Sequence, residues 1–338
     1  MFSAKLFLAP FGGTHRSILF GGRPAPEYFR FNFEVVQTLA EADFAIIPNA
    51  VRKVSPEFME HVRRTVAYAK TLDKKTIVFI SGDLGYRIHM DGVLVFKVSE
   101  YAHGKRKNEI MSPPFVEDFW AGAQFEPRRK SARPSIGFCG YAGFPSLATR
   151  VKYLLRNSTF DAAALASPHW GAHKRGIYFR RKAVGLLRRD PRIDARFTIR
   201  GAFFLNAAPT PQSRDSARRE FLDNLRSADF SLAPKGDGNY SIRFFEALSM
   251  GRIPILIDTD MVLPLEKVID YSKFIVRVPH TEMHALPDRI ATLYGSLSDE
   301  EFMNMQKAAR DTFVQYLRQD AFYNTAFSIL RDRGPEAL

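Results

Sequence analysis

The chain has 338 residues, of which 46% are hydrophobic, so it is long enough for two domains with a core in each. Its formal net charge of +13 indicates an anionic partner, and its single cysteine, Cys139, excludes an internal disulfide framework. That thiol lies in an apolar stretch, where a core role is expected rather than a nucleophilic one. There is no apolar run of about 18 residues, and no charged region leads into a hydrophobic segment near Met1, so a soluble protein of a reducing compartment is expected.

The first half of the chain alternates apolar, strand-like segments with helical patterns. Its clearest helix spans residues 56–72, where Val62, Val66 and Ala69 fall on one face. The predicted strands are residues 5–9, 44–48, 76–81 and 93–98. This alternation is typical of open parallel sheets covered by helices on both faces.

The second half continues the same alternation. The predicted strands are residues 136–139, 196–200, 229–233, 253–257 and 274–278. The predicted helices are residues 146–156, 175–189, 213–227, 241–250 and 283–296. A last long helix, from Asp299 to about Leu330, has amphipathic spacing and is expected to pack back across both domains. Each half therefore reads as a Rossmann-like α/β unit.

A stretch rich in Pro, Arg and Lys, residues 124–134, separates the halves and has no hydrophobic period, so it is interpreted as a linker. The predicted domains are a Rossmann-like domain over residues 1–127, a second one over 128–300, and a carboxy-terminal helical segment over 301–338.

The most informative stretch, residues 229–254, sets an apolar strand, a glycine-bearing loop and an Arg-containing helix in succession. Such an order can bind a phosphate, because backbone amides and the positive helix end meet the anion. Ser241 is predicted to cap the helix through its hydroxyl, and Arg243 offers a planar donor fork from the first turn. Glu246 on the same face suits sugar hydroxyls. An ordinary ion pair between Arg243 and Glu246 is the alternative.

Ligands of parallel sheets lie beyond the carboxyl ends of the strands, so the loops there supply the other candidates. Arg200 follows a strand and could offer a second fork to a diphosphate, or it could form a structural ion pair. The full set of predicted binding residues is Arg243, Glu246, Ser241, Lys235, Gly236, Asn239, Tyr240, Arg200 and Gly140. Nothing argues for a metal site, because His169 and His173 are at i,i+4 without a helical context or a nearby acidic partner.

Part of this pattern resembles a known family. The carboxy-terminal signature of the exostosin-type glycosyltransferases, family 47, is similar to the series Pro234, Gly236, Ser241, Arg243, Glu246, Gly251 and Pro254, continued by Leu263-Pro264 and residues 274–278. Weaker resemblances are residues 5–9, 41–48, 79–85, Pro113-Pro114 and 136–140. The similarity spans about residues 5–295, and it is specific only around 229–278. The family has His before the Asp of its "D-x-G" motif, whereas this chain has Gly82 there.

The resemblance implies a GT-B architecture of two facing Rossmann-like domains, with the donor bound by the second domain and the acceptor by the first. It also implies an inverting transfer without an obligatory metal or other cofactor, in which Arg243, Lys235 and helix amides stabilise the leaving group. The donor would be a UDP-sugar, with GDP- or dTDP-sugars as alternatives, and the acceptor a surface polysaccharide or glycolipid. For the general base the candidates are Asp83 first and His15 second. Asp83 could instead brace its turn.

Several basic runs account for the positive charge, among them residues 105–107, 128–130 and 180–182. They are either solvated surface or a means of attachment to an anionic membrane leaflet. A cytoplasmic protein is expected, with peripheral attachment to the inner face of the membrane as an option. Nucleic-acid binding is not favoured, because no zinc-finger spacing or RNP-like strand is present. The alternative function is a noncatalytic basic protein that binds a polyanionic glycan or nucleic acid.

Overall fold

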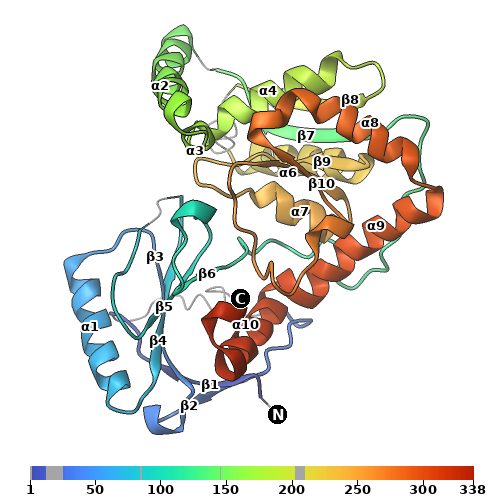
Figure 1. Cartoon of the computed structure of the whole chain (residues 1–338). Coiled ribbons are helices and arrows are strands. Elements are labelled where there is room, and N and C mark those ends of the chain that lie inside the picture. Colours follow the sequence, from blue (N-terminus) through green and yellow to red (C-terminus); the bar gives the residue numbers. More distant parts are fainter. Residues whose placement is uncertain (1, 13–25, 84–85, 145, 202–209) are drawn as a thin grey trace. The chain divides into compact units, whose positions relative to one another are not determined.

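The computed structural model describes residues 2–12, 26–83, 86–144, 146–201 and 210–338. Its contacts divide the chain into two compact units (Figure 1). Unit 1 consists of Met1–Phe115, Val262–Asp270 and Val314–Leu338, and unit 2 consists of Val116–Met261 and Tyr271–Phe313. None of the described helices is both long and apolar enough to cross a membrane.

Unit 1 contains a six-stranded parallel sheet in the order β2-β1-β3-β4-β5-β6. The strands are β1 (Ala4–Leu8), β2 (Phe33–Val36), β3 (Phe44–Val51), β4 (Lys75–Ile80), β5 (Val93–Lys97) and β6 (Glu109–Met111). The four longer strands confirm the sequence prediction. The edge strands β2 and β6 were not predicted, because three or four residues are too few to display a period of two.

Helices cover this sheet by their apolar faces. Helix α1 (Pro56–Lys70) begins after Ser55, whose hydroxyl accepts a hydrogen bond from the Phe58 amide, and it packs Val62 and Val66 against the sheet. Helix α10 (Gln319–Arg333) buries Tyr323 against Phe79 and Phe96 of the sheet. The aromatic contacts hold a segment from the end of the chain in the core of unit 1.

Unit 2 contains a five-stranded parallel sheet in the order β11-β10-β9-β7-β8. The strands are β7 (Ser135–Tyr141), β8 (Asp194–Arg200), β9 (Phe230–Leu232), β10 (Ile253–Asp258) and β11 (Val276–Pro279). The chain passes from β7 to β8 on one side and then returns to β9 on the other, so the strand order reverses at β7. In such sheets, ligands bind in the crevice at this switch point, between the carboxyl ends of β7 and β9.

The described helices of unit 2 pack on this sheet or, as α2 does, on a neighbouring helix (Figure 1). They are α2 (Leu147–Ala166), α3 (His169–Ala172), α4 (Gly176–Arg189), α6 (Pro211–Ser227), α7 (Ile242–Met250), α8 (Leu286–Ser296) and α9 (Asp299–Thr312). Short 3₁₀ turns lie at Leu39–Glu41, Ala102–Gly104, Tyr271–Lys273, His280–Ala285 and Pro335–Ala337. Helix α4 packs Phe179 and Leu187 into the core beside Phe138 of β7. Helix α6 approaches β7 so closely that a Cβ on Gly137 would lie 2.8 Å from Asn224 Oδ1.

Both units are parallel α/β sheets with helices, which confirms the predicted fold class. The unit boundary lies at Phe115/Val116 instead of residue 127, because Phe119 and Trp120 pack beside Leu225 and Met250 of unit 2. The predicted linker, residues 124–134, contains no helix or strand. It is nevertheless held to unit 2, where Lys130 Nζ donates to Tyr294 O at 2.7 Å.

Two helix predictions were wrong in extent. The long helix expected from Asp299 is interrupted by a π-helical turn at Phe313–Leu317 and by an extended residue, Arg318, so α9 belongs to unit 2 and α10 to unit 1. Helix α2 continues to Ala166 instead of ending at residue 156. The polar run after that position is compatible with a helix because Ser158 and Thr159 donate to the carbonyls of the preceding turn.

Candidate functional site

Arg243 lies in the first turn of α7, and its guanidinium reaches the carboxyl end of β7. Its Nη2 donates to Cys139 O at 3.0 Å, and its Cζ lies 5.0 Å from the centre of the Phe138 ring. A Cβ at Gly140 would lie 2.0 Å from Nη2, so only glycine leaves room for the guanidinium. Burial lowers the pKa of Arg243, against the raising effect of Glu246. The structure thus brings together two residues, Arg243 and Gly140, that the sequence analysis selected separately.

A second guanidinium, that of Arg180 from α4, spans the switch point. Its Nη1 donates to Tyr141 O at the end of β7 at 3.3 Å, and its Nη2 donates to Lys235 O after β9 at 3.2 Å. Burial, and next the positive charge of Arg243, lower the pKa of Arg180 to about 10. The sequence analysis placed Arg180 in a basic surface run and missed this role. The position of Arg180 in the helical repeat could have indicated this role, because Arg180 shares a face with the buried Ile177 and Val184.

Arg243 and Arg180 both carry a positive charge that no neighbouring carboxylate compensates in the described structure. Within the described part of the chain neither forms an ion pair, and the Nε atoms of both are buried without a hydrogen-bond partner. A buried cation is destabilised unless an anion or further hydrogen bonds compensate it. Two such guanidiniums at the switch point of a parallel sheet therefore form a binding site for an anion.

The loop after β9 is a braced turn. Gly236 N donates to Tyr240 O at 2.8 Å, which closes the loop. Asn239 is buried: its Nδ2 donates to Asp260 O at 3.1 Å, and its Oδ1 accepts from Thr259 Oγ1 at 2.6 Å. These bonds fix the loop backbone beside the two guanidiniums, and the Asn239 side chain is used within the protein.

Lys235 has a different orientation from the one that the sequence suggests. Its ammonium is buried, donates to Ala172 O at 2.6 Å and lies 5.5 Å from the centre of the Phe179 ring. Burial lowers the pKa of Lys235 to about 7, against the raising effect of Asp237. Lys235 thus ties the loop to α3 and α4.

Glu246 and Arg200 both have charged partners in unit 2. Glu246 Oε1 accepts from Arg218 Nη1 at 2.9 Å, so the ion pair of Glu246 is with α6 and not with Arg243. Arg200 Nη2 lies 2.5 Å from Glu220 Oε2 and also donates to Ala217 O. The structural ion pair considered for Arg200 is therefore present.

The predicted cap of α7 is wrong. Ser241 is the N-cap residue, but its buried side chain makes no capping hydrogen bond within the described structure. Phe244 N donates to Ser241 O at 3.2 Å, whereas the amides of Ile242 and Arg243 receive no acceptor from the Ser241 hydroxyl. Amides of this kind add to the anion site formed by Arg243 and Arg180.

The first candidate base, Asp83, lies in unit 1. Asp83 is exposed and follows β4 directly after Gly82, whose φ is +92°. His15 lies outside the described residues.

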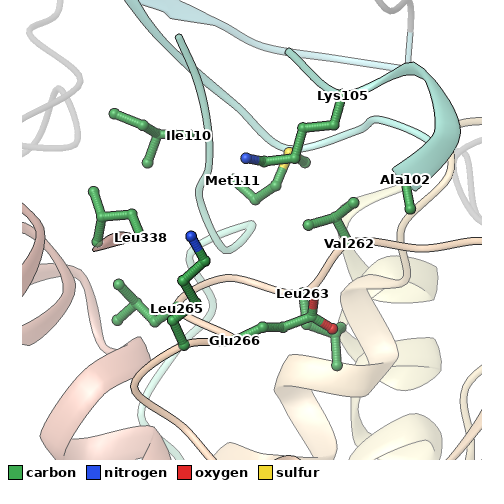
Figure 2. A pocket seen from close by; sticks show the side chains of 10 residues that line it. Ala102, Lys105, Ile110, Met111, Val262, Leu263, Leu265, Glu266 and Leu338 are labelled. Carbon is green, nitrogen blue, oxygen red and sulfur yellow. The ribbon is translucent and has the colours of Figure 1, made fainter. Parts of the chain in front are cut away.

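A hollow of about 260 Å³ is present within unit 1, close to β6 (Figure 2). Its lining is mostly apolar, with Ile110, Met111 and Leu263 among the side chains, and Lys105, Lys267 and Glu266 add charges of both signs. Burial, and next the charge of Lys267, lower the pKa of Lys105. The sequence analysis did not single out this hollow, whose residues come from separate parts of the chain.

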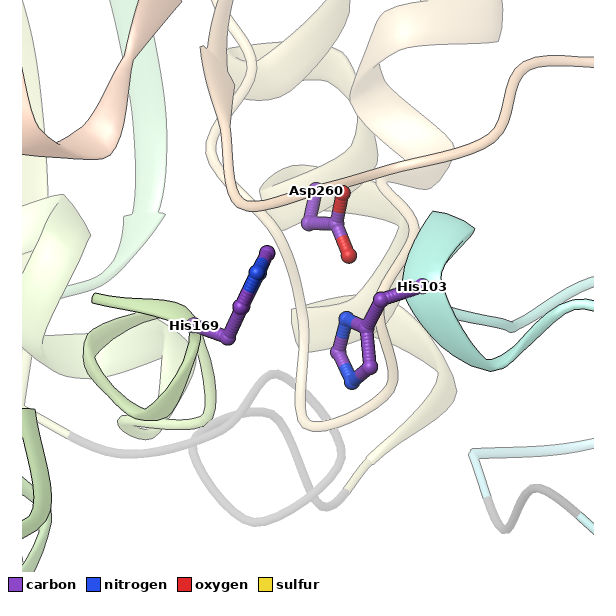
Figure 3. Close-up of side chains that lie close together, drawn as sticks. All are labelled: His103, His169 and Asp260. Carbon is purple, nitrogen blue, oxygen red and sulfur yellow. The ribbon is translucent and has the colours of Figure 1, made fainter. Parts of the chain in front are cut away.

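The histidine pair has a helical context after all, contrary to the sequence prediction. His169 begins α3 and His173 is its C-cap residue. The carboxylate of Asp260 also lies within 4.8 Å of a ring nitrogen of His169 (Figure 3), so an acidic partner is nearby. The third side chain drawn there, His103, belongs to unit 1. The His169 and Asp260 side chains supply two ligands, fewer than the three or four of protein zinc sites.

Comparison with known proteins addresses the expected family. Residues 200–293 match the family model of the Exostosin GT47 domain. These residues are thus similar to the exostosin-type family 47 that the sequence analysis expected. The matched segment contains Arg243, Glu246 and the loop after β9, whereas Arg180, Gly140 and Asp83 lie outside it.

Exostosin relatives show the same local similarity. Exostosin-1 of Drosophila melanogaster is 27% identical over 125 residues, which are 37% of this chain and 16% of that protein. The Exostosin-1 homolog of Caenorhabditis elegans is 29% identical over 101 residues, which are 30% of this chain and 25% of that protein. The matches thus span a quarter or less of these relatives.

Solved structures of glycosyltransferases align over most of the chain. A glycosyltransferase from Rickettsia africae ESF-5 covers 97% of this chain and 98% of its own, with 12% identity and a TM-score of 0.43. An alpha-glucosyltransferase in complex with UDP-glucose and DNA containing an abasic site covers 97% and 99%, with 10% identity and a TM-score of 0.40.

Proposed function

We propose that the chain is an inverting glycosyltransferase that transfers a sugar from a nucleotide-diphosphate donor. The donor is UDP-linked, and its diphosphate binds between Arg243 and Arg180 at the switch point of unit 2. The observation that supports this most is the pair of partly buried guanidiniums, each with a buried and unsatisfied Nε, that have no carboxylate partner among the described residues. A diphosphate would supply the missing charge and accept from the free Nε groups and from the amides of α7.

In the proposed reaction, an acceptor hydroxyl attacks the anomeric carbon while the bond from that carbon to the diphosphate oxygen breaks. The hydroxyl proton passes to a general base, for which we propose Asp83 first and His15 second. Negative charge develops on the departing nucleoside diphosphate, and the two arginines stabilise it. These fixed cations perform the task without an obligatory metal ion. The general base and the acceptor belong to unit 1, where the hollow beside Lys105 and Lys267 is one place for an anionic acceptor group.

Glu246 is proposed to accept hydrogen bonds from the ribose of the donor. Its carboxylate is held in place by Arg218, which leaves its second oxygen for a ligand. The acceptor is proposed to be a surface polysaccharide or glycolipid. A cytoplasmic location with peripheral attachment to an anionic membrane through the basic surface follows from that proposal and from the charge of +13.

Binding measurements on three variants test the donor site. Calorimetry with UDP, GDP and dTDP, in the presence of a chelator, should give micromolar to millimolar dissociation constants for the preferred nucleotide. Arg243→Gln and Arg180→Gln should each weaken binding about tenfold or more, because each loses a charge-assisted hydrogen bond. Arg188→Gln, at an exposed position of the same helix as Arg180, is the matched control.

The alternative, a noncatalytic polyanion-binding protein, predicts different results. It would show no preference for a nucleotide, no hydrolysis of a donor sugar and a steep salt dependence of glycan or nucleic-acid binding. UDP binding that survives in both arginine variants would contradict the proposed site.

A further inference from the structure

Helix α2 presents large apolar side chains to solvent. Leu147, Leu154, Leu155 and Leu165 are 73%, 54%, 66% and 92% exposed, and Val151 is 47% exposed. Their spacing places them along one face of the helix. A helix at the surface of a soluble domain normally turns its apolar face inward, so this arrangement is inverted.

The opposite side of α2 makes the contacts with the rest of unit 2. Asn157 is buried there, and Tyr153 packs against Phe144 with ring centres 4.8 Å apart. At the end of the helix, α3 lies alongside, since a Cβ on Gly171 would be 3.9 Å from the Ala164 Cβ. Helix α2 is thus anchored by its polar and aromatic side, at the edge of unit 2 (Figure 1).

Two of the positive charges on α2, Arg150 and Lys152, flank its apolar face, whereas Arg156 lies on the opposite side of the helix. Arg150, Lys152 and Arg156 are exposed, and within the described structure none of them forms an ion pair. Asp161 is the one acidic residue in the helix sequence, and its carboxylate is paired with Lys174. The helix therefore offers an apolar face bordered by uncompensated positive charge.

We propose that α2 docks unit 2 on an anionic membrane surface. The helix lies in the plane of the interface, with the leucine face among the acyl chains and the side chains of Arg150 and Lys152 at the headgroups. A second copy of this chain is a poorer partner, because the cationic borders of two α2 helices would repel each other. The proposal uses none of the residues of the arginine site, and it does not depend on glycosyl transfer.

Vesicle flotation with the full chain tests the proposal. Vesicles of phosphatidylcholine with about 30% phosphatidylglycerol should bind the protein, and pure phosphatidylcholine vesicles should bind it at least tenfold more weakly, because each nearby cation contributes. Leu154→Gln with Leu155→Gln should weaken binding to the anionic vesicles at least tenfold, because two apolar side chains no longer enter the membrane. Tyr68→Gln, a substitution of a 53% exposed aromatic side chain on α1, is the matched control and should bind normally.

Trp170 provides an independent signal. It is 48% exposed on α3, next to α2, so its fluorescence should shift to the blue on anionic vesicles in the wild type and not in the double variant. Circular dichroism and UDP affinity check that the double variant is folded.

Three outcomes would overturn the proposal. The first is no binding of the wild type to anionic vesicles. The second is equal binding of the folded double variant, which would assign membrane attachment to basic residues elsewhere. The third is that the wild type forms a concentration-dependent dimer in the absence of lipid and that the double variant remains a monomer.

Discussion

Gly140→Ala should disable the donor site by displacing Arg243. The new Cβ would lie 2.0 Å from Arg243 Nη2 and 2.9 Å from Cζ, distances at which a neighbour must move. The guanidinium, whose Cζ lies 5.0 Å from the centre of the Phe138 ring, must therefore leave its place at the end of β7. The hydrogen bond to Cys139 O and the alignment toward a diphosphate are then lost together.

The expected loss follows from the bonds that Arg243 would make to the diphosphate. A charge-assisted hydrogen bond contributes about 1.5–3 kcal/mol, which corresponds to roughly a 10- to 150-fold rise in the dissociation constant of UDP. Calorimetry on the wild type, Gly140→Ala, Arg243→Ala and the double variant forms a double-mutant cycle. Because both changes remove the same interaction, Gly140→Ala should add less than about 0.5 kcal/mol in the Arg243→Ala background.

Gly185→Ala is the matched control, since a Cβ at this position of α4 meets nothing within 4 Å. It should leave UDP affinity unchanged and stabilise the helix by about 0.5–1 kcal/mol. The reasoning would be refuted by normal UDP affinity in a folded Gly140→Ala protein, or by losses that add fully in the double variant.

The remaining predictions concern Lys235, Glu246 and Asp83. Burial lowers the pKa of Lys235 to about 7. At higher pH the unfolded chain therefore binds a proton that the folded chain lacks, and the free energy of unfolding should rise between pH 7.5 and 9 by up to about 1.4 kcal/mol per unit. Lys235→Met should reduce this slope in urea titrations, and equal slopes would contradict the buried ammonium. Glu246→Gln should weaken UDP binding about fivefold or more by calorimetry, through a lost hydrogen bond to the ribose. Arg218→Gln should weaken UDP binding less than Glu246→Gln does, because the carboxylate itself remains, and unfolding of Glu246→Gln would make Glu246 a structural partner of Arg218. Asp83→Asn should lower the rate of transfer about 10²-fold at constant donor affinity, because basicity is lost while shape is kept. A larger effect of His15→Gln would assign the base to His15.

Much of the donor site could be read from local sequence. The strand, loop and helix over residues 229–254 form as predicted, because their apolar periods and the αL residue Gly251 are local signals. Contacts between distant residues could not be read in this way. The bond from Arg243 to Cys139 O joins residues 104 positions apart, and Gly140 was selected only as a residue after a strand.

The direction in which a side chain points is the second feature that the sequence does not predict. Lys235 and Arg180 are both cations near the same loop, yet the lysine points into the contacts with α3 while the arginine crosses the switch point. The packing of α3 and α4 on the sheet decides between these directions. The break between α9 and α10 has a similar origin, because the amphipathic period continues through it and gives no sign of the extended residue Arg318.

The composition of unit 1 has a consequence for how the chain is made. Phe79 and Phe96 leave the ribosome long before Tyr323, the side chain of α10 that packs against both. Until then this part of the sheet has no aromatic cover, whereas almost all of unit 2 has already been synthesised. Unit 2 is thus expected to fold first, although its sequence begins later. A nascent chain arrested before α10 would expose apolar strands, which are the surfaces that chaperones bind and that aggregate when they are unprotected.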